Sequence, residues 1–473
     1  MTTSIKSINF SNSNFKKKLN INGLSCDTFV AKDCLFGAFS FSSNCKIKEL
    51  LDLSGVTFPD QSTFSNVEVL GKTIFDGVTL PDKMTISACN FGDTGSFEGL
   101  KTGDDVKFKN CHFGKKTSFL KKRNRLTEFG KRNVFSNSTF GYKSDMSDCK
   151  FGIGCSFEKG TIITNTNFSK AHFGSQTRFN GVTIHNASFN DCTFENMATF
   201  ETCTFNHQTN FSGVKFIKTT EGHGPLSFLG SMFNGTTDFT GCTFSGPIAF
   251  KHGEFNEIDF TGTVFSAKAD FQNRAFKGKT KFDDCHFAVA PEFHNATLHE
   301  DTSFINTNFD DTSNSSAAAS YRTLRRKMEE HRSKQNQSKF YALELRSVRM
   351  SGALQGTAKF LSFLYDMFCG YGLRMGRPIA WLFGINFAFT CLYFTIGLNY
   401  KQNHFFPNFK FTMEQLVRPF YVWMGTYKPP SGLNNIWDDV DIFFQVLASF
   451  QSLISLGLLT LLILSIRRQF KMD

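Results

Sequence analysis

The 13 cysteines carry the most obvious chemical potential in this chain, since thiols bind zinc, form disulfides or act as nucleophiles. None of them stands in a CxxC pair, the spacing typical of zinc and redox sites. In an extended chain, residues two apart point to the same face, so a cysteine at such a spacing from a buried residue is itself buried. Ten cysteines lie two positions before a member of a regular apolar pattern: Cys34, Cys45, Cys89, Cys111, Cys149, Cys155, Cys192, Cys203, Cys242 and Cys285. We therefore predict small buried residues, and neither metal nor disulfide.

Other catalytic signatures give no support for an enzyme. The chain contains no GxxxxGKS or GxxxxGKT loop, no HExxH and no GxSxG. His112, His172 and His286 each directly precede a phenylalanine of the pattern, so we expect their side chains to point outward. We predict no catalytic, cofactor-binding or metal-binding residues.

Phenylalanine sets the pattern, with 60 residues among 473. It recurs at alternating gaps of five and six, giving a period of eleven with two apolar anchors. One run comprises Phe260, Phe265, Phe271, Phe276, Phe282, Phe287, Phe293, Leu298, Phe304 and Phe309. The register can be followed from about Phe36 to Phe309, with slips near 120–140 and 217–227.

This period suits neither an amphipathic helix nor a simple alternating strand. It suits a coil whose short sides each present one large side chain inward, with Gly, Asn, Asp, Ser and Thr at the turns. Four sides close a coil of about 22 residues, and stacked coils pair at about 4.8 Å. Residues 36–309 then form about twelve coils in a solenoid about 60 Å long.

The units Phe189-Asn-Asp-Cys-Thr-Phe194 and Phe239-Thr-Gly-Cys-Thr-Phe244 resemble those of the pentapeptide-repeat family. The resemblance implies an all-β solenoid, a right-handed quadrilateral β-helix, although here five- and six-residue spacings alternate. Some members of that family mimic DNA and bind topoisomerases, a role associated with an acidic surface. Of the net charge of +11, residues 1–316 carry only +1, so this role and nucleic-acid binding are both disfavoured.

Basic residues gather in two places. The segment 115–132 coincides with a register slip and is expected to leave the coil as a loop, and residues 317–349 carry a net charge of +6. The second segment has helical spacing and is predicted to form one or two amphipathic helices that cap the solenoid or connect it to a membrane. The candidate contacts for anionic lipid or a partner are Lys121, Lys122, Arg123, Arg125, Arg325, Arg326 and Lys327; the alternative for the first segment is a solvated loop.

Two segments are long and apolar enough to cross a bilayer. Residues 378–400 and 442–466 lack charged side chains, and each spans about 30 Å as a helix. Arg374 and Arg377 precede the first, and the second ends in Arg467-Arg-Gln-Phe-Lys471. This bias predicts a multi-pass membrane protein with both termini cytoplasmic, and we expect the bacterial inner membrane.

A polar stripe runs along the second span. Its members are Gln445, Ser449, Ser452, Ser455 and Thr460. The stripe predicts either helix–helix hydrogen bonds within a bundle or the lining of a pore. The connection between the spans includes the semi-apolar stretch 411–425, but it contains no filter-like Thr-Val-Gly-Tyr-Gly.

The C-terminal part resembles the membrane region of some bacterial pentapeptide-repeat proteins. The resemblance rests on stretches such as Tyr321-Arg-Thr-Leu-Arg-Arg-Lys-Met328 and Leu461-Leu-Ile-Leu-Ser-Ile-Arg-Arg-Gln-Phe470. We predict a solenoid over 1–312, a helical linker over 313–375 and a membrane region over 376–473. The expected function is a membrane-anchored scaffold or sensor that contacts lipid and a protein partner and forms a homo-oligomer. The alternative is a homo-oligomeric channel gated by the solenoid.

Overall fold

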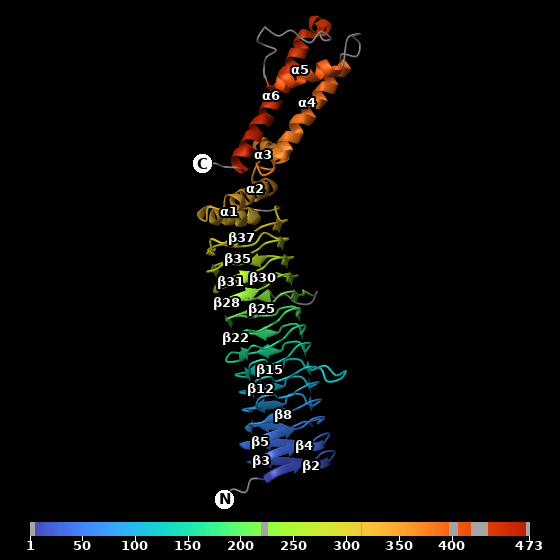
Figure 1. The fold of residues 1–473 in the computed structure, drawn as a ribbon, viewed down its shortest axis with the longest axis vertical. Coiled ribbons are helices and arrows are strands. Elements are labelled where there is room, and N and C mark those ends of the chain that lie inside the picture. The colour runs from blue at the N-terminus through green and yellow to red at the C-terminus, as the bar shows by residue number, and fades with distance from the viewer. Residues whose placement is uncertain (1–4, 219–225, 314, 397–404, 418–433, 470–473) are drawn as a thin grey trace. The chain divides into compact units, whose positions relative to one another are not determined.

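The computed structural model describes residues 5–218, 226–313, 315–396, 405–417 and 434–469. The chain divides into two compact units, Met1–Asp311 and Thr312–Asp473, which are considered separately. The first is a β-solenoid of about 14 turns, as expected (Figure 1). It has more turns than the phenylalanine register indicates, because paired strands begin at Ile5, upstream of Phe36.

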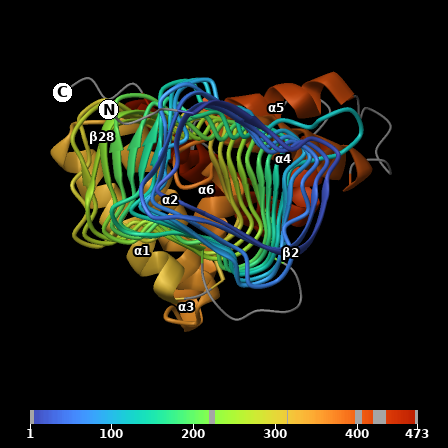
Figure 2. The same cartoon turned by 90° about the horizontal axis from the view of Figure 1, so that it is seen from below.

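The coils of the solenoid trace a four-sided outline, and successive coils pair through parallel strands (Figure 2). One wall at the N-terminal end comprises β1 (Ile5–Asn9), β3 (Ser25–Val30), β5 (Cys45–Asp52), β7 (Val67–Val69) and β8 (Lys72–Ile74). A second comprises β2 (Asn14–Asn22), β4 (Leu35–Ser42), β6 (Thr63–Ser65), β10 (Thr85–Ser87), β12 (Lys107–Lys109), β15 (Val134–Ser136), β18 (Ser156–Phe157) and β21 (Arg178–Phe179).

Three further sheets complete the walls. The first comprises β9 (Thr79–Leu80), β11 (Lys101–Thr102), β14 (Glu128–Phe129), β17 (Lys150–Phe151), β20 (His172–Phe173), β23 (Thr193–Phe194), β26 (Lys215–Phe216), β29 (Thr243–Phe244), β32 (Val264–Phe265), β36 (His286–Phe287) and β38 (Asn308–Phe309). The next comprises β13 (His112–Phe113), β16 (Thr139–Phe140), β19 (Ile162–Thr164), β22 (Thr183–His185), β24 (Thr204–Asn206), β25 (Thr209–Asn210), β28 (Met232–Asp238), β31 (Glu254–Asp259), β34 (Ala275–Phe276), β35 (Thr280–Lys281) and β37 (Thr302–Ser303). The shortest comprises β27 (Leu226–Ser227), β30 (Ile248–Ala249) and β33 (Ala269–Asp270).

Phenylalanine rings fill the inside of the coil in continuous columns. Phe173 stacks on Phe194 of the next coil with ring centroids 4.4 Å apart and planes 3° apart. Rings from neighbouring columns meet edge to face, as Phe179 and Phe189 do at 90°. These rings are fully buried, which confirms the predicted spine. Both geometries are those that aromatic pairs prefer, so the spacing in the sequence translates directly into packing.

The cysteines of the pattern are buried and reduced, and they make a contact that the sequence did not reveal. The thiol of Cys285 donates to the backbone carbonyl of Phe260 at 2.9 Å, one coil away. The hydroxyl of Thr263 donates to the carbonyl of Phe239 at 2.6 Å in the same way. The position two before each inward side chain, hereafter the slot, therefore favours small donors, because they satisfy a buried carbonyl.

The predicted insert is also present. Strand pairs in regular coils join residues 22 apart, as Ile86 and Phe108 do, whereas Phe108 pairs with Phe135, 27 residues later. The extra residues turn back on themselves through an antiparallel bridge between Lys122 and Arg125, and Figure 1 shows this loop leaving the wall near β15.

The second unit consists of helices. They are α1 (Ser315–Glu330), α2 (Lys334–Met350), α3 (Gly356–Cys369), α4 (Gly376–Ile396), α5 (Phe405–Val417) and α6 (Asn434–Gln469). Gly376–Thr395 and Val446–Arg467 are long and apolar enough to cross a membrane, close to the predicted 378–400 and 442–466. Helix α5 forms part of the connection between these two helices. Residues 418–425 of the predicted semi-apolar stretch lie outside the described residues.

Candidate functional site

A network of uncharged polar side chains lies between α4, α5 and α6. We call it the polar seam. Its members are Asn386, Thr390 and Tyr393 of α4, Thr412 and Gln415 of α5, and Gln451, Ser452 and Ser455 of α6. All eight are buried, in helices whose remaining residues are mostly apolar. Such groups are unfavourable in an apolar environment unless they bond to one another, so their partners decide what the seam can do.

Gln451 connects the three helices. Its amide nitrogen donates to the side-chain carbonyl of Asn386 at 2.8 Å and to the backbone carbonyl of Thr412 at 3.2 Å. Its amide oxygen accepts from the hydroxyl of Tyr393 at 3.0 Å. One side chain of α6 thus bonds to both α4 and α5.

Shorter contacts extend the seam on either side of Gln451. The hydroxyls of Thr390 and Thr412 lie 2.8 Å apart and join α4 to α5. Ser452 donates to the amide oxygen of Gln415 at 3.1 Å, which joins α6 to α5. Within the described residues, the amide nitrogen of Gln415 is buried without a hydrogen-bond partner. All other seam side chains bond to a neighbour, so the seam acts as an interhelical connection.

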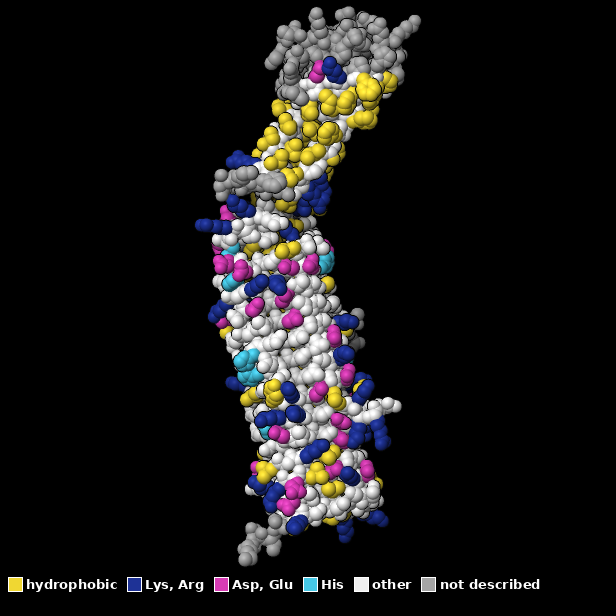
Figure 3. All heavy atoms as spheres, in the orientation of Figure 1, with side chains coloured by type: hydrophobic (Ala, Val, Ile, Leu, Met, Phe, Trp, Pro, Cys, Tyr) yellow, Lys and Arg dark blue, Asp and Glu magenta, His cyan; other side chains and the backbone are white. Residues whose placement is uncertain are grey.

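The outer faces of the same helices are apolar. The exposed side chains include Phe383, Phe387 and Leu392 of α4 and Val446, Phe450, Leu453, Leu456, Ile463 and Leu464 of α6. Figure 3 shows hydrophobic side chains gathered over these helices on the face in view. Polar groups inside and apolar groups outside are the arrangement expected of helices packed in lipid.

The predicted stripe of α6 is only partly in the seam. Ser452 bonds to Gln415, and Ser455 accepts from the amide of Asn386 at 3.3 Å. Thr460 is bonded to its own helix, at the carbonyl of Leu456, and Ser449 is half-buried. The side chain of Gln445 lies outside the described residues.

Three amide side chains of the seam, Asn386, Gln415 and Gln451, were not among the predicted residues. The signal that could have indicated them was an amide within or beside an uncharged run. The predicted stripe included residues of α6 alone, so the side chains of α4 and α5 that bond to α6 could not be identified from it.

The predicted basic contacts of the solenoid lie at the insert. Lys122 pairs with Asp76 at 2.7 Å, and the guanidinium of Arg125 donates to the hydroxyl of Thr79 at 2.8 Å. These two bonds hold the base of the insert to the wall. Lys121 and Arg123 are exposed, with Arg123 in the left-handed conformation at the turn (φ 52°).

The basic residues of α1 mostly have acidic partners within the helices. The guanidinium nitrogen of Arg325 lies 3.1 Å from Glu344 of α2, and Lys327 lies 3.1 Å from Glu330. Arg326 is exposed. Two of these three candidates therefore take part in pairs within the protein.

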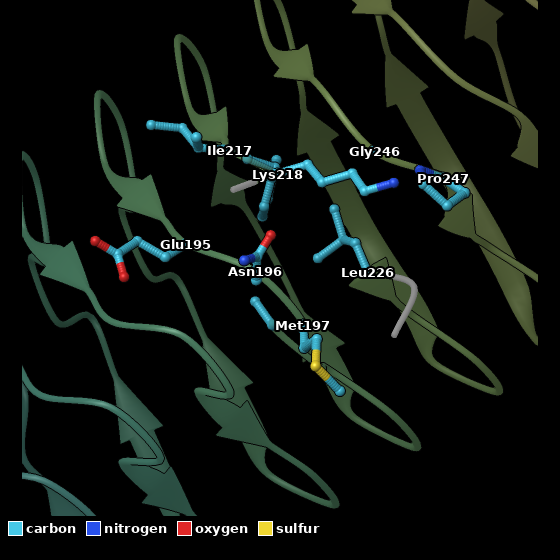
Figure 4. A pocket seen from close by; sticks show the side chains of 10 residues that line it. Glu195, Asn196, Met197, Ile217, Lys218, Leu226, Gly246 and Pro247 are labelled. Carbon is cyan, nitrogen blue, oxygen red and sulfur yellow. The ribbon is translucent and has the colours of Figure 1, made fainter. Parts of the chain in front are cut away.

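The described walls of the solenoid carry two hollows. The larger, of about 220 Å³, is lined by residues that include Thr237, Asp259 and Lys281. The smaller, of about 30 Å³, is lined by residues that include Glu195, Lys218 and Pro247 (Figure 4). It is the size of a single water molecule, and the carboxylate of Glu195 and the amine of Lys218 point away from each other. Within the described residues, no group of three or more His, Cys, Asp and Glu side chains could hold a metal ion.

Comparison with known proteins agrees with the repeat seen in the coils. Residues 228–273 match the family described as Pentapeptide repeats (9 copies). A solved structure of a trypsin-treated variant of QnrB1, a plasmid-mediated fluoroquinolone resistance protein, matches at 16% identity and a TM-score of 0.22, covering 55% of this chain and 97% of that one. No curated protein matches the chain by sequence. The matched stretch 228–273 thus consists of pentapeptide repeats, and buried phenylalanines continue through the rest of the solenoid.

Proposed function

We propose that this protein is a membrane-anchored interaction scaffold, in which α4, α5 and α6 hold the chain in a bilayer and the solenoid walls bind a protein partner. The observation that carries the anchor is the inversion of polarity across these helices. Their amides and hydroxyls bond inward to one another, while phenylalanine and leucine face outward. A helix group of this kind gains stability when lipid surrounds it.

The scaffold part of the proposal is supported by the walls of the solenoid. They are extended sheets with a near-neutral charge balance, and their hollows of about 30 and 220 Å³ are smaller than the roughly 300–1,000 Å³ of small-molecule sites. Surfaces of this kind suit a protein partner better than a small-molecule substrate.

A fractionation experiment tests the anchor. We expect the full chain to stay with membranes after washing at alkaline pH with carbonate and to require detergent for release. A variant with Phe383, Phe387 and Phe450 replaced by Ser should be released in part, because these exposed rings are its contacts with acyl chains. Release of the unaltered chain without detergent would refute the anchor.

The alternative, a channel, has one observation in its favour. The amide nitrogen of Gln415 is buried in the seam without a hydrogen-bond partner among the described residues, and such a donor can bond to water or an anion. Purified protein in planar bilayers should then conduct, and Ser452→Leu should change the conductance. Electrical silence across voltage and pH would leave the scaffold.

A further inference from the structure

Helix α3 has an apolar face that no part of the described chain covers. Phe360 is 60%, Leu361 63% and Phe363 50% exposed, all on one short helix. A soluble protein rarely exposes several large apolar residues side by side without a ligand or partner. The face therefore needs an occupant.

The opposite face of α3 is fixed to α2 by charge-assisted hydrogen bonds. Asp366 accepts from Arg346 at 2.8 Å and from Arg349 at 2.7 Å. Arg349 also donates to the hydroxyl of Tyr371 at 3.1 Å, and Tyr371 lies 2.7 Å from the hydroxyl of Ser362. The orientation of the helix is thus set from its polar side, and the exposure of the phenylalanines is a consequence of that orientation.

The apolar face is continuous with the first candidate span. Phe368 meets Trp381 of α4 edge to face at 5.4 Å, and Trp381 and Ile379 are themselves exposed. A left-handed Gly370 (φ 57°) ends α3, and α4 begins six residues later at Gly376. Tryptophan is enriched where a span meets the headgroups, which places α3 at that level of a bilayer.

Basic side chains surround the same level. Lys359 lies on α3 and Arg374 lies between α3 and α4. Both are exposed, as is Arg467. Arg467 ends the second candidate span, and α3 packs against both α4 and α6. Exposed cations on and beside helices with an apolar face complement anionic headgroups above acyl chains.

We propose that α3 is an in-plane membrane helix, which inserts Phe360, Leu361 and Phe363 among the acyl chains of a leaflet and contacts anionic phospholipid headgroups through Lys359, Arg374 and Arg467. This rests on the proposed anchor. A bilayer is favoured over a second protein because the face joins that of a span without interruption and carries cations at its edge.

Photocrosslinking in the full chain tests the proposal. The photoreactive residue p-benzoylphenylalanine replaces Phe360 in one variant, Phe387 of α4 in a second and Leu35 of the solenoid in a third; Phe387 is 56% and Leu35 58% exposed. The proteins are reconstituted in nanodiscs of phosphatidylcholine with or without phosphatidylglycerol, and adducts are identified by mass.

We expect lipid adducts at 360 and 387 and none at 35, with a several-fold higher yield at 360 when phosphatidylglycerol is present. Lys359→Gln combined with Arg374→Gln should remove that gain but leave the yield at 387 unchanged. Adducts at 387 without any at 360 would overturn the in-plane helix alone, whereas their absence at both would overturn the anchor. Adducts from 360 to a second copy of the chain would show a protein interface instead.

Discussion

Arg274 is a charged residue that occupies the slot. It lies two positions before Phe276, where many other coils carry cysteine, threonine or serine, and its side chain is 1% exposed. Its guanidinium lies 3.9 Å from the ring centroid of Phe255 and donates to the backbone carbonyls of Ser231 and His252. Two of its nitrogens have no hydrogen-bond partner among the described residues, and burial lowers the pKa of Arg274 to about 9, so the side chain stays charged at neutral pH.

Replacing Arg274 with Met should therefore stabilise the solenoid. The change removes a buried charge that forms no ion pair within the described part of the chain and keeps an unbranched side chain of similar length, and we expect the free energy of unfolding to rise by about 1–2 kcal/mol. Chemical denaturation followed by circular dichroism measures the effect. Arg178→Met, at an exposed position, should change stability by less than about 0.5 kcal/mol. A loss of stability in Arg274→Met would mean that the bonds to Ser231 and His252 outweigh the burial of charge.

The slot cysteines should resist alkylation in the folded protein. Burial raises the pKa of Cys155, Cys203 and Cys285 to about 12, so almost no thiolate is present at pH 8. We expect iodoacetamide to modify these residues only after unfolding in guanidinium, as measured by peptide mass. Leu35→Cys, on the surface of the solenoid, is the matched control and should react at once. Rapid modification of Cys285 in the native state would contradict the burial of the slot.

At the scale of the element, each stacked ring contributes to more than one coil. Phe173 stacks on Phe151 at 4.6 Å and on Phe194 at 4.4 Å, and it is fully buried. We expect Phe173→Ala to lower the free energy of unfolding by about 3–5 kcal/mol, since it leaves a cavity that the rigid coils cannot close. Phe15→Ala, in a partly exposed ring of the second strand, should cost less than half of this. Thermal or denaturant unfolding measures both variants. Equal losses of stability in Phe173→Ala and Phe15→Ala would show that burial of the ring does not determine the effect.

We expect the stability of the link between α2 and α3 to depend on pH. Burial alone would raise the pKa of Asp366, but hydrogen bonds from Arg346 and Arg349 outweigh it and hold this pKa below its usual value. A carboxyl with a depressed pKa stabilises the fold above its unfolded pKa of about 4, and this stability is lost as the pH falls through the folded value. Asp366→Asn should lower the thermal midpoint in detergent at pH 7, and the difference from the unaltered protein should shrink as the pH falls below about 4. A difference in thermal midpoint between the two proteins that stays constant as the pH falls would exclude ionisation of the Asp366 carboxyl as the cause.

The repeated elements could be predicted from the sequence, whereas the side-chain contacts between different helices could not. The phenylalanine spacing predicted the solenoid, the buried cysteines and the position of the insert, because each coil repeats the same local solution. The start of the solenoid was missed because Phe10 and Phe15 precede the regular spacing, yet they meet edge to face at 5.3 Å. The seam was missed for another reason: Gln451 becomes significant only when Asn386, 65 residues earlier, lies against it. No repeat in the sequence indicates that two residues so far apart along the chain are in contact.

At the scale of the whole molecule, charge is divided unevenly between the two units. Residues 1–316 carry a net charge of +1, whereas residues 317–473 carry the remaining +10. Arg374 precedes the first candidate span, Arg377 lies at its start and Arg467 ends the second, so these basic residues gather where both spans meet the same side. Such residues stay on the cytoplasmic side during insertion. The expected orientation therefore places both ends of the chain in the cytoplasm.

Fusions at the C-terminus and between the spans test that orientation. Green fluorescent protein attached after Asp473 should fluoresce, and alkaline phosphatase attached there should be inactive, because the first folds in the cytoplasm and the second only in an oxidising compartment. Phosphatase inserted between the spans, within 418–433, should be active. Changing Arg374, Arg377, Arg467 and Arg468 to Gln should yield a mixed population, since Lys401, Lys410, Arg418 and Lys428 between the spans then compete with the basic residues that remain outside them. An active phosphatase at the C-terminus of the unaltered chain would place the solenoid and its partner outside the cytoplasm, and the reduced state of its cysteines would then need another cause.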